Sequence, residues 1–381
     1  MVAQTYQELY VVKKIVRAWV CAMFCMLVPG LLFAGHEHYT SPGDARAFGL
    51  SHAYTAVAHD HNTLFMNPAG LDTIPDRRFR FTLGYEDYAD PRSFGEQQYT
   101  PIFIPRFVFT APGWGVGMHS TYYMNPSDFN NGAYEVTKVN TLDVGAAMGI
   151  GMLSFGVSLQ ASKESVTDNI SMGQHNLSIG AIYDLALDLM LSDYEPKGDA
   201  YDVLVMKAGI LFDTGIVSVG AYHDKLFDFM AWSQDREFPA FNGLTDDLNV
   251  GIGLRSRRID QFGRINTFRV MGSLDVDHIG DDDRRMLQLG VEGGLYLTDY
   301  NRIAVRAGYA EQLENLSDVL VGAIQPSRGT FSLGVGVELL HISADAAIQI
   351  PATALPLFNE TGDDPYDGEL PKLRITGGIS F

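Results

Sequence analysis

Five of the ten histidines lie close to the N-terminal end of the chain: His36, His38, His52, His59 and His61. Imidazole nitrogens bind divalent metals, and His36-x-His38 and His59-Asp60-His61 could each offer two of them, the second with a carboxylate in between. These two short pairs would make a fixed site only if the fold brought them together. We therefore interpret the histidines as ordinary polar residues and predict no metal site and no cofactor.

Acidic residues form two runs in the second half of the chain. One run is Asp281–Asp283, and the other contains Asp363, Asp364, Asp367 and Glu369. Carboxylates bind calcium, but neither run has the spaced ligands of an EF-hand loop. We interpret both runs as solvated charges of external loops, and the sequence leaves calcium or host molecules open as ligands.

No catalytic motif is present in the sequence. We find no G-x-S-x-G elbow, Walker loop, H-E-x-x-H helix or dinucleotide fingerprint. Ser51 precedes His52, but neighbours in the chain do not make a catalytic triad. The net charge of −19 also argues against binding to a phosphate backbone. We predict a protein that is not an enzyme and has no nucleic-acid partner.

Two prolines, Pro101 and Pro105, fall within an apolar strand candidate at 99–110. Proline removes a hydrogen-bond donor from a sheet, so a central strand should not carry two of them. One interpretation is a kinked or broken strand that opens a lateral gate in the wall of a sheet. The alternative is that this stretch is a loop or the margin of a strand.

The N-terminal segment, residues 1–34, has the pattern of an export signal. Lys13, Lys14 and Arg17 precede an uncharged stretch at 18–35, and we expect cleavage after Ala34. A retained transmembrane helix is the alternative, although the stretch is short and no stop-transfer pattern follows. Both cysteines lie inside this segment, so the mature chain would have no disulfide or thiolate site.

The last strand candidate ends on an aromatic residue at the C-terminal position. Leu373, Ile375, Ile379 and Phe381 fall on one face, and polar residues or glycine fall on the other. Together with the export signal, this pattern predicts a signal for the barrel-assembly machinery and a location in the bacterial outer membrane.

The same alternation recurs throughout residues 78–381, as in the apolar series Phe79, Phe81, Leu83 and Tyr85. In a membrane barrel the apolar side faces lipid and the polar and glycine side faces the lumen. Tight connections at 111–113, 214–215, 298–301 and near 340 alternate with long polar ones at 124–133, 228–247, 311–328 and 351–370. We predict an all-β, transmembrane antiparallel β-barrel. The candidates number about fifteen, with a misfit at 171–185; because single-chain barrels have even numbers, we expect about 14 strands.

Residues 35–77 lack strand alternation and carry a distinctive motif. It runs from Ala53 to Asp60 as AYTAVAHD and continues as Asn67, Pro68, Ala69, Gly70 and Leu71. Here the chain resembles the FadL-type long-chain fatty acid transporters of the outer membrane and the related PorV-like barrels. His59 is a departure, since relatives usually have Asp there. The resemblance implies an N-terminal hatch, residues 35–77, that folds into the lumen of a fourteen-stranded barrel.

The resemblance also implies a function. We expect passive uptake of hydrophobic small molecules such as long-chain fatty acids, with outer-membrane lipid around the barrel. The ligand would displace the hatch around Asn67–Leu71 and leave either laterally or into the periplasm. External aromatics at Phe229, Trp232, Phe238 and Phe241 would capture the ligand. The alternatives are a PorV-like assembly or secretion-associated barrel and a surface adhesin barrel with acidic external loops.

Overall fold

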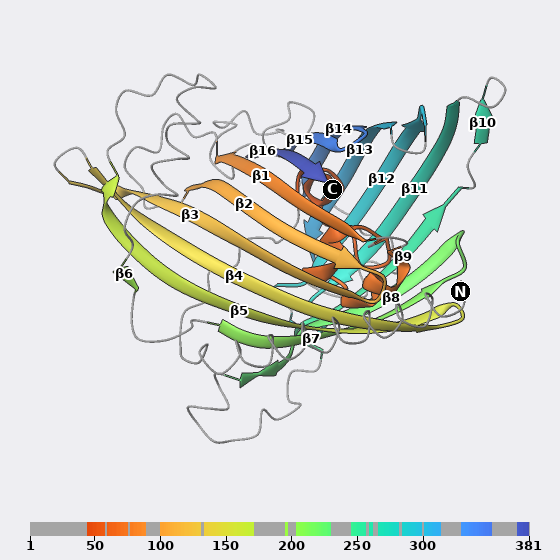
Figure 1. Cartoon of the computed structure of the whole chain (residues 1–381), viewed down its shortest axis with the longest axis horizontal. Coiled ribbons are helices and arrows are strands. Elements are labelled where there is room, and N and C mark those ends of the chain that lie inside the picture. The colour runs from red at the N-terminus through yellow and green to blue at the C-terminus, as the bar shows by residue number, and fades with distance from the viewer. Residues whose placement is uncertain are drawn as a thin grey trace, which may run out of the picture.

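A computed structural model shows one large antiparallel sheet wrapped around a small N-terminal segment (Figure 1). It describes residues 44–57, 59–74, 77–88, 100–130, 133–170, 195–196, 203–229, 245–256, 259–261, 266–281, 284–298, 301–313, 329–352 and 372–380. The predicted export signal, 1–34, lies outside these residues. Among them, no helix is long and apolar enough to cross a membrane.

The strands are long and follow one another in chain order. The first half contains β1 (Arg78–Tyr88), β2 (Thr100–Ala111), β3 (Trp114–Asn130), β4 (Ala133–Ile150), β5 (Leu153–Ile170), β6 (Glu195–Pro196), β7 (Val203–Asp213) and β8 (Val217–Asp228). The second half contains β9 (Leu248–Arg255), β10 (Ile259–Gln261), β11 (Asn266–Asp277), β12 (Met286–Tyr296), β13 (Asn301–Gln312), β14 (Thr330–Leu339), β15 (Ile342–Pro351) and β16 (Lys372–Ser380).

Fourteen of the sixteen strands close into a ring, while β6 and β10 pair outside it with β5 and β11. Neighbours in the ring are neighbours in sequence, except that β5 pairs with β7 and β9 with β11. The ring closes where β1 pairs with β16, from Arg80↔Ser380 to Tyr88↔Lys372. The all-β, fourteen-stranded barrel predicted from the sequence is confirmed. The extra candidate at 171–185 lies outside the described residues.

The barrel is apolar outside and polar inside. On β16, Leu373, Ile375 and Ile379 are 37–44% exposed, whereas Arg374 and Thr376 between them are buried. This arrangement is the reverse of that in a soluble protein, where apolar side chains face inward. It recurs around the ring because the outer surface of the barrel contacts lipid. This is the construction of bacterial outer-membrane barrels, and it confirms the predicted location. Phe381 lies outside the described residues.

The two ends of the barrel differ in their connections. Tight turns join β2 to β3, β4 to β5, β7 to β8 and β14 to β15 at one end, which is the periplasmic end in barrels of this type. The connection expected to be long at 124–133 is not a loop, because β3 and β4 continue through it and pair at Asn125↔Glu135 and Asn130↔Ala133. At 17 and 18 residues, β3 and β4 exceed the about 9–11 residues that a tilted strand needs to cross a bilayer.

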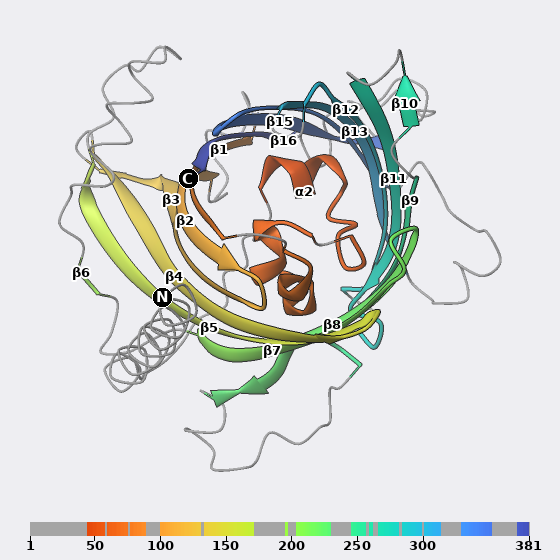
Figure 2. The ribbon, with the colours of Figure 1, turned by 45° about the vertical axis from the view of Figure 1, so that its right-hand side comes forward.

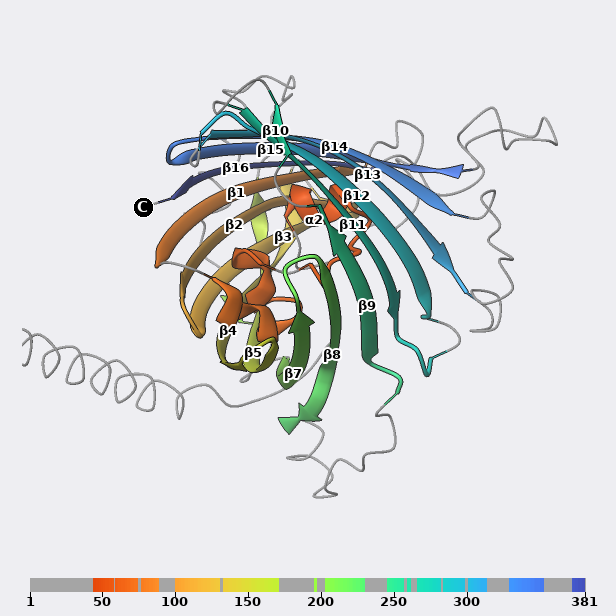
Figure 3. The ribbon, with the colours of Figure 1, turned by 90° about the vertical axis from the view of Figure 1, so that its right-hand side faces the viewer.

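The segment before β1 lies inside the barrel (Figures 2 and 3). It contains the short helix α2 (Ala45–Gly49) and two 3₁₀ helices, η2 (His61–Leu64) and η3 (Pro68–Thr73). Helix α2 packs against β13–β16, and η3 packs against β4, β5 and β7 on the other side of the lumen. We use the name hatch for its described residues, 44–57 and 59–74. Irregular backbone is tolerated at membrane depth here because the barrel wall surrounds it.

Candidate functional site

The candidate functional site is the contact between the hatch and the lumenal wall, and Asn67 is at its centre. The Asn67 side chain caps η3, since its Oδ1 accepts a hydrogen bond from Ala69 N at 3.2 Å. Its Nδ2 donates to Thr55 O at 2.9 Å and to Ile210 O of β7 at 3.3 Å. Asn67 is fully buried, and one side chain therefore joins two parts of the hatch to the wall.

The rest of the Asn67–Leu71 motif serves the same turn. Pro68 occupies the first turn of η3, where its fixed φ and missing N–H cost nothing. Ala69 and Leu71 are fully buried, and Leu71 packs with Leu64 and Phe65 in an apolar cluster. The motif therefore forms a capped 3₁₀ turn whose apolar side chains pack in the hatch core.

Asp60 organises the polar side of the hatch. Its Oδ1 caps η2 through Asn62 N at 2.9 Å, and its Oδ2 accepts hydrogen bonds from Tyr54 at 2.6 Å and from Arg46. Burial raises the pKa of the Asp60 carboxyl, but the charge of Arg46 and the hydrogen bond from Tyr54 help to hold the pKa below its usual value. Asp60 is thus a half-buried carboxylate held by the hatch itself.

Arg46 connects this network to the barrel. Its guanidinium donates to Glu292 of β12 at 2.9 and 3.2 Å, and Glu292 also accepts from Arg302 and, at 2.8 Å, from Arg306. Three arginines therefore share one buried carboxylate. Arg46 and Glu292 are 246 positions apart in sequence, and no signal in the sequence pairs them.

A second polar group links the hatch to β1. Asp44 caps α2 through Arg46 N and Ala47 N at 2.9 and 3.2 Å, and its other oxygen lies 3.2 Å from His61 Nε2. Arg80 of β1 donates to His61 Nδ1 at 3.2 Å, which leaves the ring proton on Nε2, facing Asp44. Burial raises the pKa of Asp44, yet the bond to His61 and nearby cations hold it well below its usual value.

Two hatch aromatics stack against wall arginines. The Arg374 guanidinium of β16 lies 4.5 Å from the Phe48 ring centroid, and that of Arg106 of β2 lies 4.6 Å from the Phe65 ring centroid. Ala45 N also donates to Thr376 Oγ1 of β16 at 3.1 Å. Cation–π contacts are stronger where water is excluded, and these contacts fasten the hatch on the side where the barrel closes.

Glycines on the lumenal face of the wall let the hatch backbone approach closely. A Cβ at Gly308 of β13 would lie 2.6 Å from Leu50 C, and one at Gly220 of β8 would lie 2.5 Å from Thr55 O. Similar overlaps with the hatch occur at a set of positions that we call the glycine belt: Gly117, Gly145, Gly156, Gly209, Gly220, Gly253, Gly290 and Gly308. The alternation in the sequence places glycine on the lumenal face, but it does not show that these positions receive the hatch.

The prolines proposed as a gate both lie in β2. Pro105 is in the middle of the strand, and Ile104 and Pro105 pair with Gly84 and Leu83 of β1 but have no partner in the described β2–β3 register. The missing N–H of Pro105 therefore falls on the β3 side. Pro101 lies at the margin of β2, beside a bulge in the same register. The β2–β3 ladder therefore lacks one hydrogen-bond donor next to Arg106, which contacts the hatch.

The histidines of the described segment do not converge. His59 faces Thr73 and Asp213, whereas His61 faces Asp44 and Arg80. No three His, Cys, Asp or Glu side chains gather as a metal site within the described part of the chain. His36, His38, Trp232, Phe238 and Phe241 lie outside it. Phe229 packs on a small cluster with Ala161 and Leu204.

Searches of known proteins give matches to solved structures only. No family model matches the chain, and no curated protein matches it. The CymD monoaromatic hydrocarbon channel is similar over 88% of this chain and 95% of its own, with 12% identity and a TM-score of 0.46. A FadL homologue from Pseudomonas aeruginosa is similar over 91% and 99%, with 13% identity and a TM-score of 0.43. A mutant of the TodX monoaromatic hydrocarbon channel is similar over 89% of this chain and 98% of its own, with 12% identity and a TM-score of 0.44.

The fold is similar to that of FadL-type channels. The Asn67–Leu71 motif resembles the same group of proteins. At these identities the likeness concerns the fold, and the ligand is argued below from the residues of this chain.

Proposed function

We propose that this barrel is a channel for passive uptake of hydrophobic small molecules across the outer membrane. The observation that carries the proposal is the coincidence of a filled lumen with an interrupted wall. Leu50, Tyr54 and Leu64 of the hatch are fully buried, because the hatch packs against the wall on both sides of the lumen. The β2–β3 ladder lacks the hydrogen bond of Pro105 beside the hatch, although the register is the same on both sides of it.

This arrangement favours a lateral route for an apolar molecule. Beside Pro105 lies the hatch residue Phe65, a buried side chain whose ring contacts Arg106 of β2 and His119 of β3. Arg106 directly follows Pro105, so an apolar hatch side chain lies beside the missing hydrogen bond of the ladder. Leaving sideways into lipid gains the burial of apolar surface, and no displacement of the hatch is needed. No energy source is implied, and flux would follow the gradient.

The ligand class follows from the route and from the similar structures. Two of these are monoaromatic hydrocarbon channels and one is a FadL homologue. Long-chain fatty acids and monoaromatic hydrocarbons are thus the first two probes. The protein would act without covalent chemistry, as a binding and guiding wall.

The proposal is tested by restoring the missing donor. Pro105→Val supplies the N–H on the β3 side, and we expect uptake of both probes into proteoliposomes to fall severalfold. The matched control is Pro351→Val at the end of β15, which should leave uptake unchanged. Leakage of a polar dye should stay low in both variants because the hatch remains seated. Equal uptake by wild type and the Pro105→Val variant would refute a lateral route at this position.

A further inference from the structure

A polar cavity of about 230 Å³ lies between the hatch and the periplasmic ends of the strands. Its position follows from its lining, since Arg78 opens β1, Tyr296 ends β12 and Arg302 begins β13. The hatch contributes a second wall through Arg46, His59 and Asp60. By the same measure a water molecule needs about 10–15 Å³, so the cavity has room for a small anion and several waters.

The lining carries an excess of positive charge. It contains seven arginines and five carboxylates. Most of the carboxylates are already engaged: Glu292 by three arginines, Asp345 by Arg306, and Asp60 by Arg46. The remaining acids, Asp44 and Glu338, lie near His61 and Arg78. Arg255 is paired with Asp213, which lies outside this lining. The excess charge is therefore left on Arg80 and Arg269.

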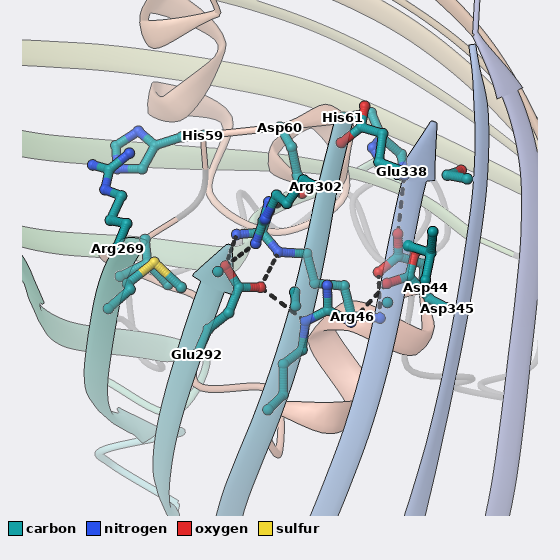
Figure 4. A pocket seen from close by; sticks show the side chains of 18 of the residues that line it. Asp44, Arg46, His59, Asp60, His61, Arg269, Glu292, Arg302, Glu338 and Asp345 are labelled. Carbon is teal, nitrogen blue, oxygen red and sulfur yellow. Dashed lines mark hydrogen bonds and ion pairs between the residues drawn. The ribbon is translucent and has the colours of Figure 1, made fainter. Parts of the chain in front are cut away.

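These charges are separated across the cavity. Figure 4 shows Arg269 and His59 together on one side. Asp44, Glu338 and Asp345 lie on the opposite side. Among the described residues the half-buried Arg269 has no hydrogen-bond or ion-pair partner. Arg255, which is 9% exposed, donates through Nη2 to Asp213 at 2.5 Å, but its Nε has no partner. A buried donor without an acceptor is costly, so Arg255 Nε and Arg269 leave room for an acceptor in addition to Asp213.

His59 adds an acceptor of its own. The Thr73 hydroxyl donates to Gly70 O at 2.8 Å, so His59 Nδ1, 2.9 Å from Thr73 Oγ1, must be the donor between these two residues. Nε2 is buried, has no hydrogen-bond partner and lies 3.8 Å from Asp213 Oδ2; in the neutral ring it carries a lone pair. Burial and the charge of Arg255 lower the pKa of His59 to about 3, which keeps the ring neutral.

A ligand that satisfies both the arginines and His59 Nε2 needs anionic oxygens for the arginines and one hydroxyl that donates to Nε2. Hydrogen phosphate has this combination, whereas sulfate has the same shape and charge but no proton to donate at neutral pH. We propose that the cavity is a binding site for a phosphate-type oxyanion, with Arg255 and Arg269 on its oxygens and His59 accepting from its hydroxyl. The source would be free phosphate or a phosphomonoester headgroup. Because the anion would contact both hatch and wall, its binding stabilises the seated hatch.

The test uses the full barrel in detergent and isothermal titration with inorganic phosphate, sulfate and glycerol phosphate. For wild type we expect saturable phosphate binding at least about tenfold tighter than sulfate binding. Arg269→Gln should weaken both anions about tenfold or more, and His59→Ala should abolish the preference for phosphate. Arg284→Gln, a matched charge change at the outer end of the barrel, should change neither. If glycerol phosphate binds with the same affinity as inorganic phosphate, the natural ligand is a phosphomonoester headgroup. If glycerol phosphate does not bind, the natural ligand is free phosphate.

The result that overturns the site is the absence of saturable phosphate binding, or binding that Arg269→Gln and Arg284→Gln affect equally. Equal affinity for sulfate and phosphate in wild type would refute the role of His59. Heat-modified gel mobility checks that each variant is folded. The measurement does not involve uptake of hydrophobic probes, so its failure is distinct from failure of the proposed transport.

Discussion

Gly308→Ala should unseat the hatch, because the new methyl group would enter space held by hatch backbone. The built Cβ would lie 2.6 Å from Leu50 C and 2.7 Å from both Ser51 N and Ser51 Oγ. Ordinary contact begins at 3.4 Å, so the hatch would have to move by roughly 0.8 Å. Ser51 and the following His52 already have φ of 51° and 62°, a left-handed conformation that leaves little freedom to adjust.

The expected cost follows from these distances. Overpacking a filled site costs about 1–3 kcal/mol, and the backbone position of two of the three atoms favours the upper half of that range. At about 1.4 kcal/mol for each factor of ten, 2–3 kcal/mol raises the displaced fraction of the hatch about 30- to 150-fold. Polar-dye efflux from proteoliposomes and single-channel conductance should both report this increase.

The matched control is Gly272→Ala on β11, where the built Cβ meets nothing closer than 3.8 Å. It makes the same change in a neighbouring part of the wall, so the intrinsic effect of alanine in a strand is shared. If Gly308→Ala and Gly272→Ala conduct alike, the idea that the glycine belt seats the hatch is wrong.

Three further predictions concern the same contact. Asn67→Ala removes the cap of η3 and leaves Thr55 O without its 2.9 Å donor, so seating should weaken by about 1–3 kcal/mol, seen as faster proteolysis of the hatch in proteoliposomes. Glu292→Gln leaves three arginines without their shared charge, and a loss of about 3–5 kcal/mol should appear as dye efflux that a Glu338→Gln control does not show. Burial and the charge of Arg374 lower the pKa of His52 to about 3, so its contribution to seating is full above about pH 6.5 and falls as pH drops from there toward 3. Conductance should rise on acidification over that range and rise less in His52→Gln; an identical pH profile would contradict the assignment.

The sequence predicts the barrel well because lipid and lumen impose a simple alternation. Leu373, Ile375 and Ile379 show it in β16, and the corner at Asn67 is visible as a motif. The alternation fails where strands leave the membrane, which is why 124–133 reads as a loop although β3 and β4 continue there. Contacts between distant polar residues, such as that of Arg46 with Glu292, have no periodic signature and come only from the folded chain.

The contacts of the hatch with β16 have a consequence for assembly. Arg374 and Thr376 belong to the last strand, and Phe48 and Ala45, which they hold, belong to the segment before the first. The seam between β1 and β16 forms only when the whole chain is available, so these contacts are completed in the step that closes the ring. The hatch is therefore expected to be enclosed while β1 pairs with β16. A hatch that misses that step would have to enter a finished barrel, so the seam contacts link the placement of the hatch to the order in which the wall assembles.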